Sequence, residues 1–122
     1  MIIGIGCDLA ETRRIAAALE RPGFAERIFT KEELALAEDA HRVEHLAARF
    51  AAKEAFLKAL GTGLREGRLT EIGVTKDSLG KPELTVTGRF AELAAERGVR
   101  RFHVTLSHTK DTALAVVVLE GE

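Results

Sequence analysis

The sequence predicts an α+β protein of one compact domain, in which an antiparallel sheet packs against a long central helix. Three observations indicate this class: alternating or β-branched segments occur towards both ends of the chain, a long helical segment lies between them, and turn residues separate the segments. The chain has 122 residues, of which 46% are hydrophobic and 30% charged, an ordinary globular balance. We therefore expect a single domain over residues 1–122.

The first element is a β-strand over residues 2–7, whose β-branched and glycine residues favour a central place in the sheet. Asp8 ends this strand, and a helix follows over about 11–21 with apolar residues on one face. Pro22 and Gly23 stop that helix, because proline and glycine interrupt helical hydrogen bonding.

A turn or short helix at residues 24–29 leads to a helix start at Thr30. Thr30 and Glu33 have the spacing of a capping box, in which each side chain bonds the backbone of the other residue. The longest helix is expected over about 41–60, with Gly61 as its C-terminal stop.

The second half of the chain predicts two hairpins separated by a helix. Residues 69–75 and 83–87 alternate and pair across a turn, and a helix then runs from about 87 to 98. Residues 102–107 and 113–120 form the second hairpin. The last strand is almost entirely apolar, which predicts burial on both faces.

The composition narrows the classes of function. The formal net charge is -1 at pH 7, so nothing overall favours a nucleic acid or an anionic membrane as a partner. Cys7 is the only cysteine, which rules out an intrachain disulfide. The N-terminal segment does not resemble a signal peptide, and no stretch approaches the roughly 20 apolar residues of a membrane span. We expect a cytoplasmic protein.

Asp8 has two interpretations. The spacing from Asp8 to Glu11 fits a capping box, in which Asp8 caps the first helix. Alternatively, Asp8 presents a carboxylate at the carboxyl end of a strand, where ligands bind in open α/β sheets and a hard cation such as Mg²⁺ would find an oxygen ligand. The residues alone leave both interpretations open.

The central helix carries four charges close to its apolar face. On a helical wheel, Arg49 and Lys53 fall inside the apolar sector, Glu54 and Lys58 lie on its flank, and alanines occupy the opposite face. The flanking pair fits an ordinary ion pair worth about 0.2–0.5 kcal/mol. Arg49 and Lys53 would be costly as unpaired buried cations, so they need an anion from another subunit or from a ligand phosphate.

Three turns are polar enough to contact an anionic ligand, although each is first of all a turn. Residues 61–63 follow the central helix with free backbone groups that a phosphate can approach closely. Residues 80–82 and 107–110 lie at the tips of the two hairpins.

Four segments together resemble the holo-acyl-carrier-protein synthase family of 4′-phosphopantetheinyl transferases. GIGCDLAETRRI (4–15) is similar to the opening motif of the family, and RFAAKEAFLKALGTG (49–63) is similar to its central motif. GKP (80–82) resembles the hairpin turn, and LSHTKDTALAVVVLE (106–120) resembles the closing strands. Two long motifs in the right order are specific, and the resemblance covers nearly the whole chain.

The resemblance implies a transferase that moves the 4′-phosphopantetheine group of coenzyme A to a serine of apo acyl carrier protein, releasing adenosine 3′,5′-bisphosphate. This reaction serves fatty-acid biosynthesis, with polyketide biosynthesis as an open alternative. The resemblance also implies Mg²⁺ and a homotrimer with active sites at the subunit interfaces. The expected partners are coenzyme A and acyl carrier protein, without nucleic acid or membrane.

The resemblance assigns roles to matching positions. Asp8, Glu54 and Lys58 are the predicted catalytic residues: Asp8 and Glu54 hold the metal, Glu54 is the candidate general base, and Lys58 stabilises charge on the diphosphate. The predicted coenzyme A-binding residues are Arg49, Lys53, Lys58, Gly61, Gly80, Lys81, Pro82, His108 and Thr109. Arg14, Arg21 and Phe24 match the surface that docks the carrier protein.

Among the coenzyme A-binding positions, Lys53, Lys58 and Gly61 match one subunit's side of the ligand, and the others match the neighbouring subunit's side, around the adenine and 3′-phosphate. Leu79 stands where the family often has asparagine, so the resemblance does not carry a side-chain contact to the nucleotide over to this position. Two alternatives remain: a non-catalytic module that binds coenzyme A or a nucleotide, and a structural oligomer in which Arg49 and Lys53 serve only intersubunit ion pairs. Both would retain function after loss of Asp8 or Glu54.

Overall fold

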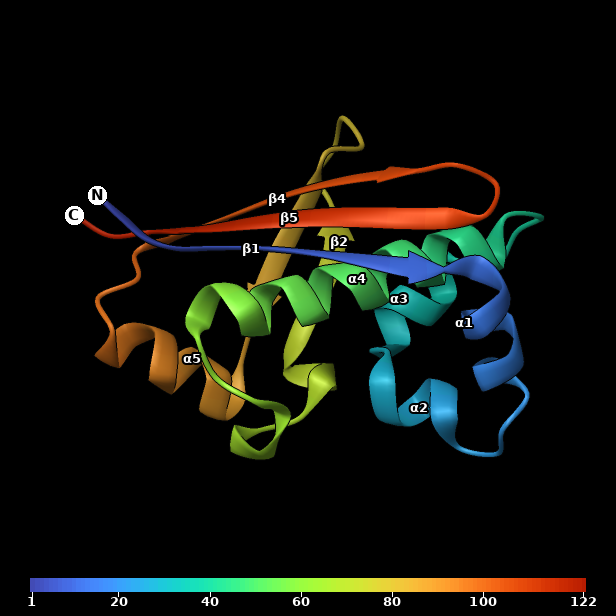
Figure 1. Cartoon of the computed structure of the whole chain (residues 1–122), viewed down its shortest axis with the longest axis horizontal. Helices are drawn as coiled ribbons and strands as arrows, with labels where there is room; N and C mark the ends of the chain where they lie inside the picture. Colours follow the sequence, from blue (N-terminus) through green and yellow to red (C-terminus); the bar gives the residue numbers. More distant parts are fainter.

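The computed structural model describes all 122 residues of the chain (Figure 1). Five helices, five strands and two 3₁₀ turns follow one another along it. In chain order they are β1 (Ile2–Glu11), α1 (Thr12–Leu19), α2 (Phe24–Ile28), α3 (Lys31–Leu36), α4 (Arg42–Leu60), the 3₁₀ turns η1 (Leu64–Glu66) and η2 (Leu69–Glu71), β2 (Ile72–Lys76), β3 (Pro82–Val86), α5 (Gly88–Glu96), β4 (Arg101–His108) and β5 (Thr112–Glu120). The predicted α+β class with a long central helix is confirmed.

The strands form two separate antiparallel sheets. One has three strands in the order β1-β5-β4, and the other is the β2–β3 hairpin. In the first sheet Val116 of β5 pairs with Cys7 of β1 on one side and with Thr105 of β4 on the other. The prediction that the first strand is central is wrong, because β5 has a strand on both sides and β1 lies at the edge.

Only one face of the three-stranded sheet is covered. Along β5 the residues from Ala113 to Leu119 alternate between buried and more exposed, because α4 packs against one face alone. The prediction that the last strand is buried on both faces is therefore wrong for the single chain. The open face is apolar: Ile5 is 68% exposed and Leu9 66% exposed on the neighbouring β1.

Helix α4 lies close against β1 and β5 because small residues face each other there (Figure 1). Its alanine face is buried, and the glycines of β1 leave room for it. A Cβ atom on Gly4 or Gly6 would overlap the carbonyl oxygens of Ala59 and Ala55. The alanine face, which the wheel placed opposite the apolar sector, is thus a packing surface for the sheet and not a solvated face.

The opposite side of α4 is covered as well. Phe56 packs edge-to-face on Phe90 of α5 with ring centroids 6.1 Å apart, and it also meets Phe102 of β4 at 6.1 Å. The β2–β3 hairpin and α3 contact the same side of the helix. Because α4 is enclosed on most sides, only a narrow strip of it can face a ligand.

Most predicted boundaries agree with the structure to within a few residues. Thr30 and Glu33 form the predicted capping box at the start of α3, and Gly61 ends α4 with φ 78°. Helix α1 is shorter than predicted, because β1 continues to Glu11. The strand expected from residue 69 starts at Ile72, since the three residues before it form a 3₁₀ turn.

The two ends of the chain meet, as Figure 1 shows. The amino group of Met1 donates a hydrogen bond of 2.8 Å to the carbonyl oxygen of Glu122. No helix combines the length and apolar character that crossing a bilayer requires.

Candidate active site

Asp8 lies inside β1 and not behind it. Its partner in the sheet register is Ala115 of β5, and the strand continues for three more residues. Helix α1 begins at Thr12, and no side chain caps its N-terminus. The interpretation of Asp8 as a helix cap is therefore wrong. The alternative placed the Asp8 carboxylate at the carboxyl end of the strand, which is also wrong in position, because Asp8 lies within β1, where its side chain is 19% exposed.

The close packing of α4 on β1 brings Lys58 to Asp8. Nζ of Lys58 donates to Oδ1 of Asp8 at 2.9 Å and to the carbonyl oxygen of Cys7 at 3.0 Å. The bond to Asp8 raises the pKa of Lys58. The predicted ion pair between Glu54 and Lys58 is not formed, because Lys58 turns to the strand and not to its neighbour one turn along the helix.

Glu54 lies half-buried beside this pair. Burial raises the pKa of Glu54, and the negative charge of Asp8 raises it further, while Lys58 acts in the opposite direction. A carboxylate that resists ionisation partly because of a second carboxylate marks a place where an additional cation is favoured.

Asp8 and Glu54 suit a hard cation, because both offer carboxylate oxygens. No group of three or more histidine, cysteine or acidic side chains lies close enough to hold a metal ion by itself. Mg²⁺ commonly takes one or two carboxylates and completes its shell with water and substrate phosphate oxygens. The donor set therefore fits a magnesium ion whose coordination a phosphate-bearing ligand completes.

Lys53 is not part of this open strip. Its side chain is fully buried, and Nζ donates to Oε1 of Glu33 at 2.7 Å and to the carbonyl oxygens of Ile72 and Leu69 at 2.6 and 3.1 Å. All three donors of the ammonium group are used within the chain. The prediction that a ligand or another subunit supplies its anion is wrong, and so is its assignment to coenzyme A, because Glu33 pairs with it and no atom reaches the surface.

Arg49 is also almost buried in the single chain, with 3% of its surface exposed. Its Nε donates to the carbonyl oxygen of Val74 at 3.3 Å, and its Nη1 donates to that of His45 at 3.2 Å. Burial lowers the pKa of Arg49, and the charges of Glu33 and Asp39 oppose that shift. The anion predicted for Arg49 is thus replaced, in part, by two backbone carbonyls.

The three residues predicted to dock a carrier protein lie together. Arg14, Arg21 and Phe24 line one open cavity of about 480 Å³ next to β1, which Leu9 also lines. The guanidinium carbon of Arg21 lies 5.5 Å from the centre of the Phe24 ring, within reach of a cation–π contact. The cavity is also lined by Ala10 and Glu11, so it lies along the end of the strand that carries Asp8.

The predicted glycine-containing turns have open space around them. Gly61 and Gly80 have φ 78° and 86°, and a Cβ atom on either would meet no atom within 4 Å. At the hairpin tip, Oδ1 of Asp77 accepts hydrogen bonds from the backbone of Leu79 and Lys81 at 2.8 and 2.9 Å. Together these bonds lower the pKa of Asp77 and hold the turn in one conformation. Lys81 and Pro82 line a cavity of about 450 Å³ beside β4.

His108 and Thr109 lie at the turn between β4 and β5. The His108 ring is 6.4 Å from that of His45 on α4, in an edge-to-face arrangement. Oγ1 of Thr109 accepts hydrogen bonds from the backbone N–H groups of Asp111 and Thr112, at 3.3 and 3.2 Å, which close the turn.

One central residue was not singled out from the sequence. Glu33 was recognised only as the end of a capping box, yet Oε1 accepts from Lys53 and from the Thr30 backbone, and Oε2 accepts from the Val74 backbone at 2.9 Å. Helical periodicity cannot reveal these contacts, since Glu33 and Val74 are 41 residues apart. The only available signal was Lys53 in an apolar sector, which required an anion somewhere.

The chain is similar to known enzymes over almost its whole length. Residues 4–117 match the model of the 4′-phosphopantetheinyl transferase superfamily. A holo-[acyl-carrier-protein] synthase of Streptomyces avermitilis is 51% identical over 124 residues, covering 98% of each chain.

Solved structures agree over the same length. The crystal structure of holo-[acyl-carrier-protein] synthase from Neisseria meningitidis superposes with a TM-score of 0.88 at 42% identity, covering 98% of this chain and 99% of the other. The enzyme of Bacillus anthracis, crystallised in complex with CoA (3′,5′-ADP), superposes with a TM-score of 0.83 at 39% identity, covering 100% of this chain and 99% of the other.

Proposed function

This chain belongs to the 4′-phosphopantetheinyl transferase superfamily, and we propose that the cluster of Asp8, Glu54 and Lys58 is its magnesium-dependent active site. The enzyme is a holo-[acyl-carrier-protein] synthase. It transfers the phosphopantetheine group of coenzyme A to a serine of apo acyl carrier protein, and the holo carrier protein then serves fatty-acid biosynthesis.

The observation that carries the proposed site is the junction of two carboxylates and one lysine from distant parts of the chain. Asp8 and Lys58 are 50 residues apart and bond at 2.9 Å, and Glu54 adds a carboxylate whose pKa is raised beside them. A diphosphate needs both a cation and a positively charged side chain to neutralise it, and this cluster offers ligands for the first and Lys58 as the second.

The transfer forms one bond and breaks one bond. The carrier serine oxygen bonds to the β-phosphorus of coenzyme A, the bond from that phosphorus to the bridging oxygen breaks, and adenosine 3′,5′-bisphosphate leaves with the bridging oxygen. The hydroxyl proton must leave the serine as the new bond forms. Glu54 is the candidate acceptor, because Asp8, the other carboxylate of the cluster, already accepts from Lys58.

Asp8 and Glu54 would hold Mg²⁺. When bound, the ion neutralises and orients the diphosphate. Lys58 stabilises the charge that develops on the diphosphate oxygens. Because Lys58 is 57% exposed and its ammonium group already lies at the carboxylate, it needs only a small movement to reach a bound phosphate.

We also propose a homotrimer with active sites at the subunit interfaces. The support is the open face of the β1-β5-β4 sheet, where the exposed Leu9 pairs with the exposed Leu114 and where Ile5, exposed as well, lies four residues before Leu9 on β1. An exposed apolar surface of this kind marks an interaction site. The turns at 80–82 and 108–109, together with Arg49, would then contact coenzyme A bound at α4 of the adjacent subunit.

For the carrier protein we propose the cavity lined by Arg14, Arg21 and Phe24. Two arginines beside an aromatic ring suit a partner with acidic side chains, which would be steered to the end of β1, the strand that carries Asp8. The cytoplasm is the proposed compartment, in agreement with the single cysteine of the chain.

The decisive experiment combines the purified protein with coenzyme A, Mg²⁺ and an apo acyl carrier protein, and then measures the mass of the carrier. We expect the mass to rise by one phosphopantetheine, and we expect chelation of Mg²⁺ with EDTA to stop the reaction. Asp8→Ala and Glu54→Ala should abolish the transfer while the circular dichroism spectrum stays unchanged. Glu92→Ala, an exposed substitution on α5, is the control that should transfer normally.

Two other outcomes would favour the alternatives. Binding of coenzyme A without any gain in carrier mass would indicate a non-catalytic binding module. Full transfer by Asp8→Ala would refute the proposed site. The trimer has its own test in sedimentation equilibrium, where Ile5→Arg should reduce the mass from three chains to one.

A further inference from the structure

We propose that Glu33 and Lys53 are positioning residues for the transfer reaction: they fix the β2–β3 hairpin on α4 and so place the coenzyme A-contacting tip of the hairpin. This inference rests on the proposed function, because the tip residues 80–82 are taken to contact coenzyme A. Neither Glu33 nor Lys53 touches a ligand, since both side chains are fully buried.

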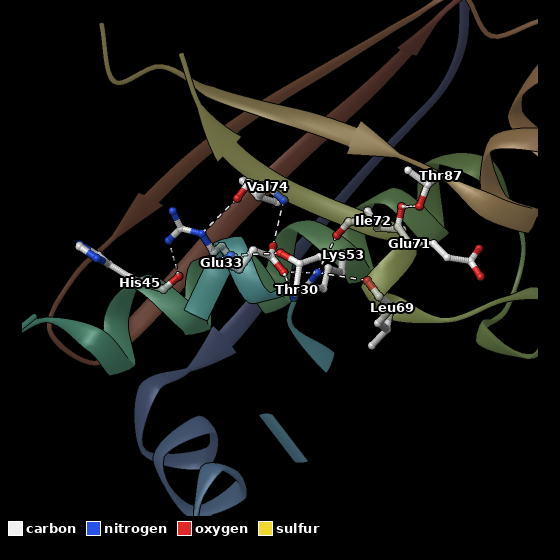
Figure 2. Close-up of polar contacts among 10 residues, drawn as sticks. Thr30, Glu33, His45, Lys53, Leu69, Glu71, Ile72, Val74 and Thr87 are labelled. Carbon is white, nitrogen blue, oxygen red and sulfur yellow. Dashed lines mark hydrogen bonds and ion pairs between the residues drawn. The ribbon is translucent and has the colours of Figure 1, made fainter. Parts of the chain in front are cut away.

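The free edge of β2 is held by charged side chains in place of a strand. One edge of β2 pairs with β3, and no strand pairs with the other. On that other edge, the carbonyl oxygen of Ile72 accepts from Nζ of Lys53, and the N–H of Val74 donates to Oε2 of Glu33 (Figure 2). The carbonyl oxygen of Val74 accepts from Nε of Arg49. The three side chains thus bond the backbone groups of β2 that a further strand would otherwise bond.

This edge needs its partners, because it is buried. Ile72 and Val74 are both fully buried, so their backbone groups cannot bond to water instead. The ion pair between Glu33 and Lys53 also ties three elements at one point, since Thr30 at the start of α3 donates to the same carboxylate oxygen that Lys53 bonds (Figure 2). These bonds therefore fix both the orientation of the hairpin relative to α4 and its distance from that helix.

The tip of the hairpin follows this anchor closely. Val74 is two residues from Lys76, which pairs with Pro82 at the end of the hairpin. Between them, the bonds to Asp77 keep the turn in one shape. A small rotation at Val74 would therefore move residues 80–82 as one unit. Arg49, which bonds Val74 directly, would move with them.

Loosening this anchor should affect the binding of coenzyme A and no other part of the reaction. Loosening the anchor should weaken the contacts to the adenine and 3′-phosphate end of coenzyme A. It should leave Asp8, Glu54 and Lys58 in place, because they lie on the β1 side of α4. It should also leave the carrier docking cavity in place, because α1 and α2 line it. We therefore expect an effect on KM for coenzyme A, and little effect on kcat or on KM for the carrier.

The test uses the full chain with the double substitution Glu33→Gln and Lys53→Met. It removes both buried charges together, so neither is left unpaired. The bonds from Lys53 to Ile72 and Leu69 are lost, and one of the two backbone N–H groups that bond Glu33 loses its acceptor, because the amide nitrogen of glutamine only donates. KM for coenzyme A should rise about tenfold or more, with kcat and KM for the carrier within about threefold of the wild type. The preference for coenzyme A over 3′-dephospho-coenzyme A should shrink by a similar factor.

Leu93→Ala is the matched control. Leu93 is a buried residue of α5, so its truncation lowers the unfolding temperature without touching the hairpin anchor. We expect KM for coenzyme A to stay at the wild-type value in this variant, even where its unfolding temperature falls as far as that of the double variant.

Each outcome is informative. If the wild type transfers and the double variant keeps the wild-type KM for coenzyme A, the positioning inference is overturned. A fall in kcat with every KM unchanged overturns it too, since that pattern reports only a smaller folded fraction. If the wild type transfers nothing, calorimetric titration with coenzyme A replaces the assay: tighter binding by the wild type than by the double variant supports positioning, equal binding overturns it, and no binding by either overturns both proposals.

Discussion

Two lysines of α4, five residues apart in one motif, form two very different ion pairs. Lys53 bonds Glu33 at 2.7 Å with both side chains fully buried. Lys58 bonds Asp8 at 2.9 Å with side chains 57% and 19% exposed. Burial lowers the pKa of Lys53, whereas the bond to Asp8 raises that of Lys58.

The two pairs differ in whether their charged groups are free to bind a further partner. Around Lys53, every donor has a protein partner, so the pair cannot exchange one partner for another. Around Lys58, the neighbouring Glu54 carries a raised pKa and the surroundings are open, so a cation and a phosphate can enter. The buried pair therefore stabilises the fold, whereas the exposed pair belongs to the proposed ligand site.

The largest expected effect comes from breaking the buried pair. Lys53→Met should lower the free energy of unfolding by about 3–5 kcal/mol, because it leaves the carboxylate of Glu33 buried without its cation. Urea unfolding at neutral pH measures this loss. A loss below about 1 kcal/mol is the range of a surface ion pair. It would show that the buried Glu33–Lys53 pair matters no more for stability than an exposed pair does.

The matching change in the exposed pair should act on activity instead. Lys58→Met should reduce kcat/KM for transfer about 10²–10³-fold, the usual cost of removing one group that stabilises transition-state charge. The urea unfolding curve should coincide with that of the wild type, because Lys58 is exposed. Mass spectrometry of the carrier measures the rate, and an unchanged rate would show that Lys58 serves only as a surface ion pair.

A smaller effect should follow from moving α4 away from β1. In Gly6→Ala the new Cβ would overlap the carbonyl oxygen of Ala55, so the helix must shift at a cost of about 1–3 kcal/mol. The new Cβ would also come within 3.0 Å of Cβ of Lys58, so the disturbance is centred on the Asp8–Lys58 pair, and we expect at least a tenfold loss of transfer in an activity assay of the folded protein.

Gly73→Ala is the control for stability in that experiment. Its Cβ would meet atoms of Thr85 and Thr30 at 3.5 and 3.6 Å, which are ordinary contact distances. A stability loss in Gly73→Ala as large as that in Gly6→Ala would argue against close helix–strand packing as the cause.

The smallest effect concerns the pH dependence of stability. The pKa of Glu54 is raised in the folded chain, so the folded state binds its proton more tightly than the unfolded state does. Its contribution to stability is therefore complete below the unfolded pKa and is lost as pH rises through the folded pKa. Without divalent metal, Glu54→Gln should stabilise the chain at neutral pH by at most about 1 kcal/mol, because Glu54 is half-exposed and screened.

Urea unfolding at neutral pH and again at about pH 4 checks this prediction, since the difference between Glu54→Gln and the wild type should vanish in acid. Mg²⁺ should stabilise the wild type and not the variant, because only the wild type keeps both carboxylates. Greater stability of the wild type at neutral pH without metal would contradict the raised pKa.

Much of the fold could be predicted because its signals are local. The capping box at Thr30 and the glycine that ends α4 are read within one turn of helix, and the two hairpins follow from alternation and turn residues. The predictions were wrong where the structure depends on contacts between residues far apart in the sequence. The glycines of β1 looked like those of a central strand, but they make room for α4 at the sheet edge.

The same division holds for the site. Through its resemblance to the family, the sequence predicted catalytic roles for Asp8, Glu54 and Lys58, and helical periodicity alone marked Arg49 and Lys53 as cations in need of an anion. Only the tertiary structure showed that Lys53 already has its anion within the chain. Glu33 reaches Lys53 across 20 residues of sequence, and Asp8 reaches Lys58 across 50. Periodicity places a side chain on a face of a helix, but it cannot say which distant segment covers that face, and burial and partnership depend on that segment.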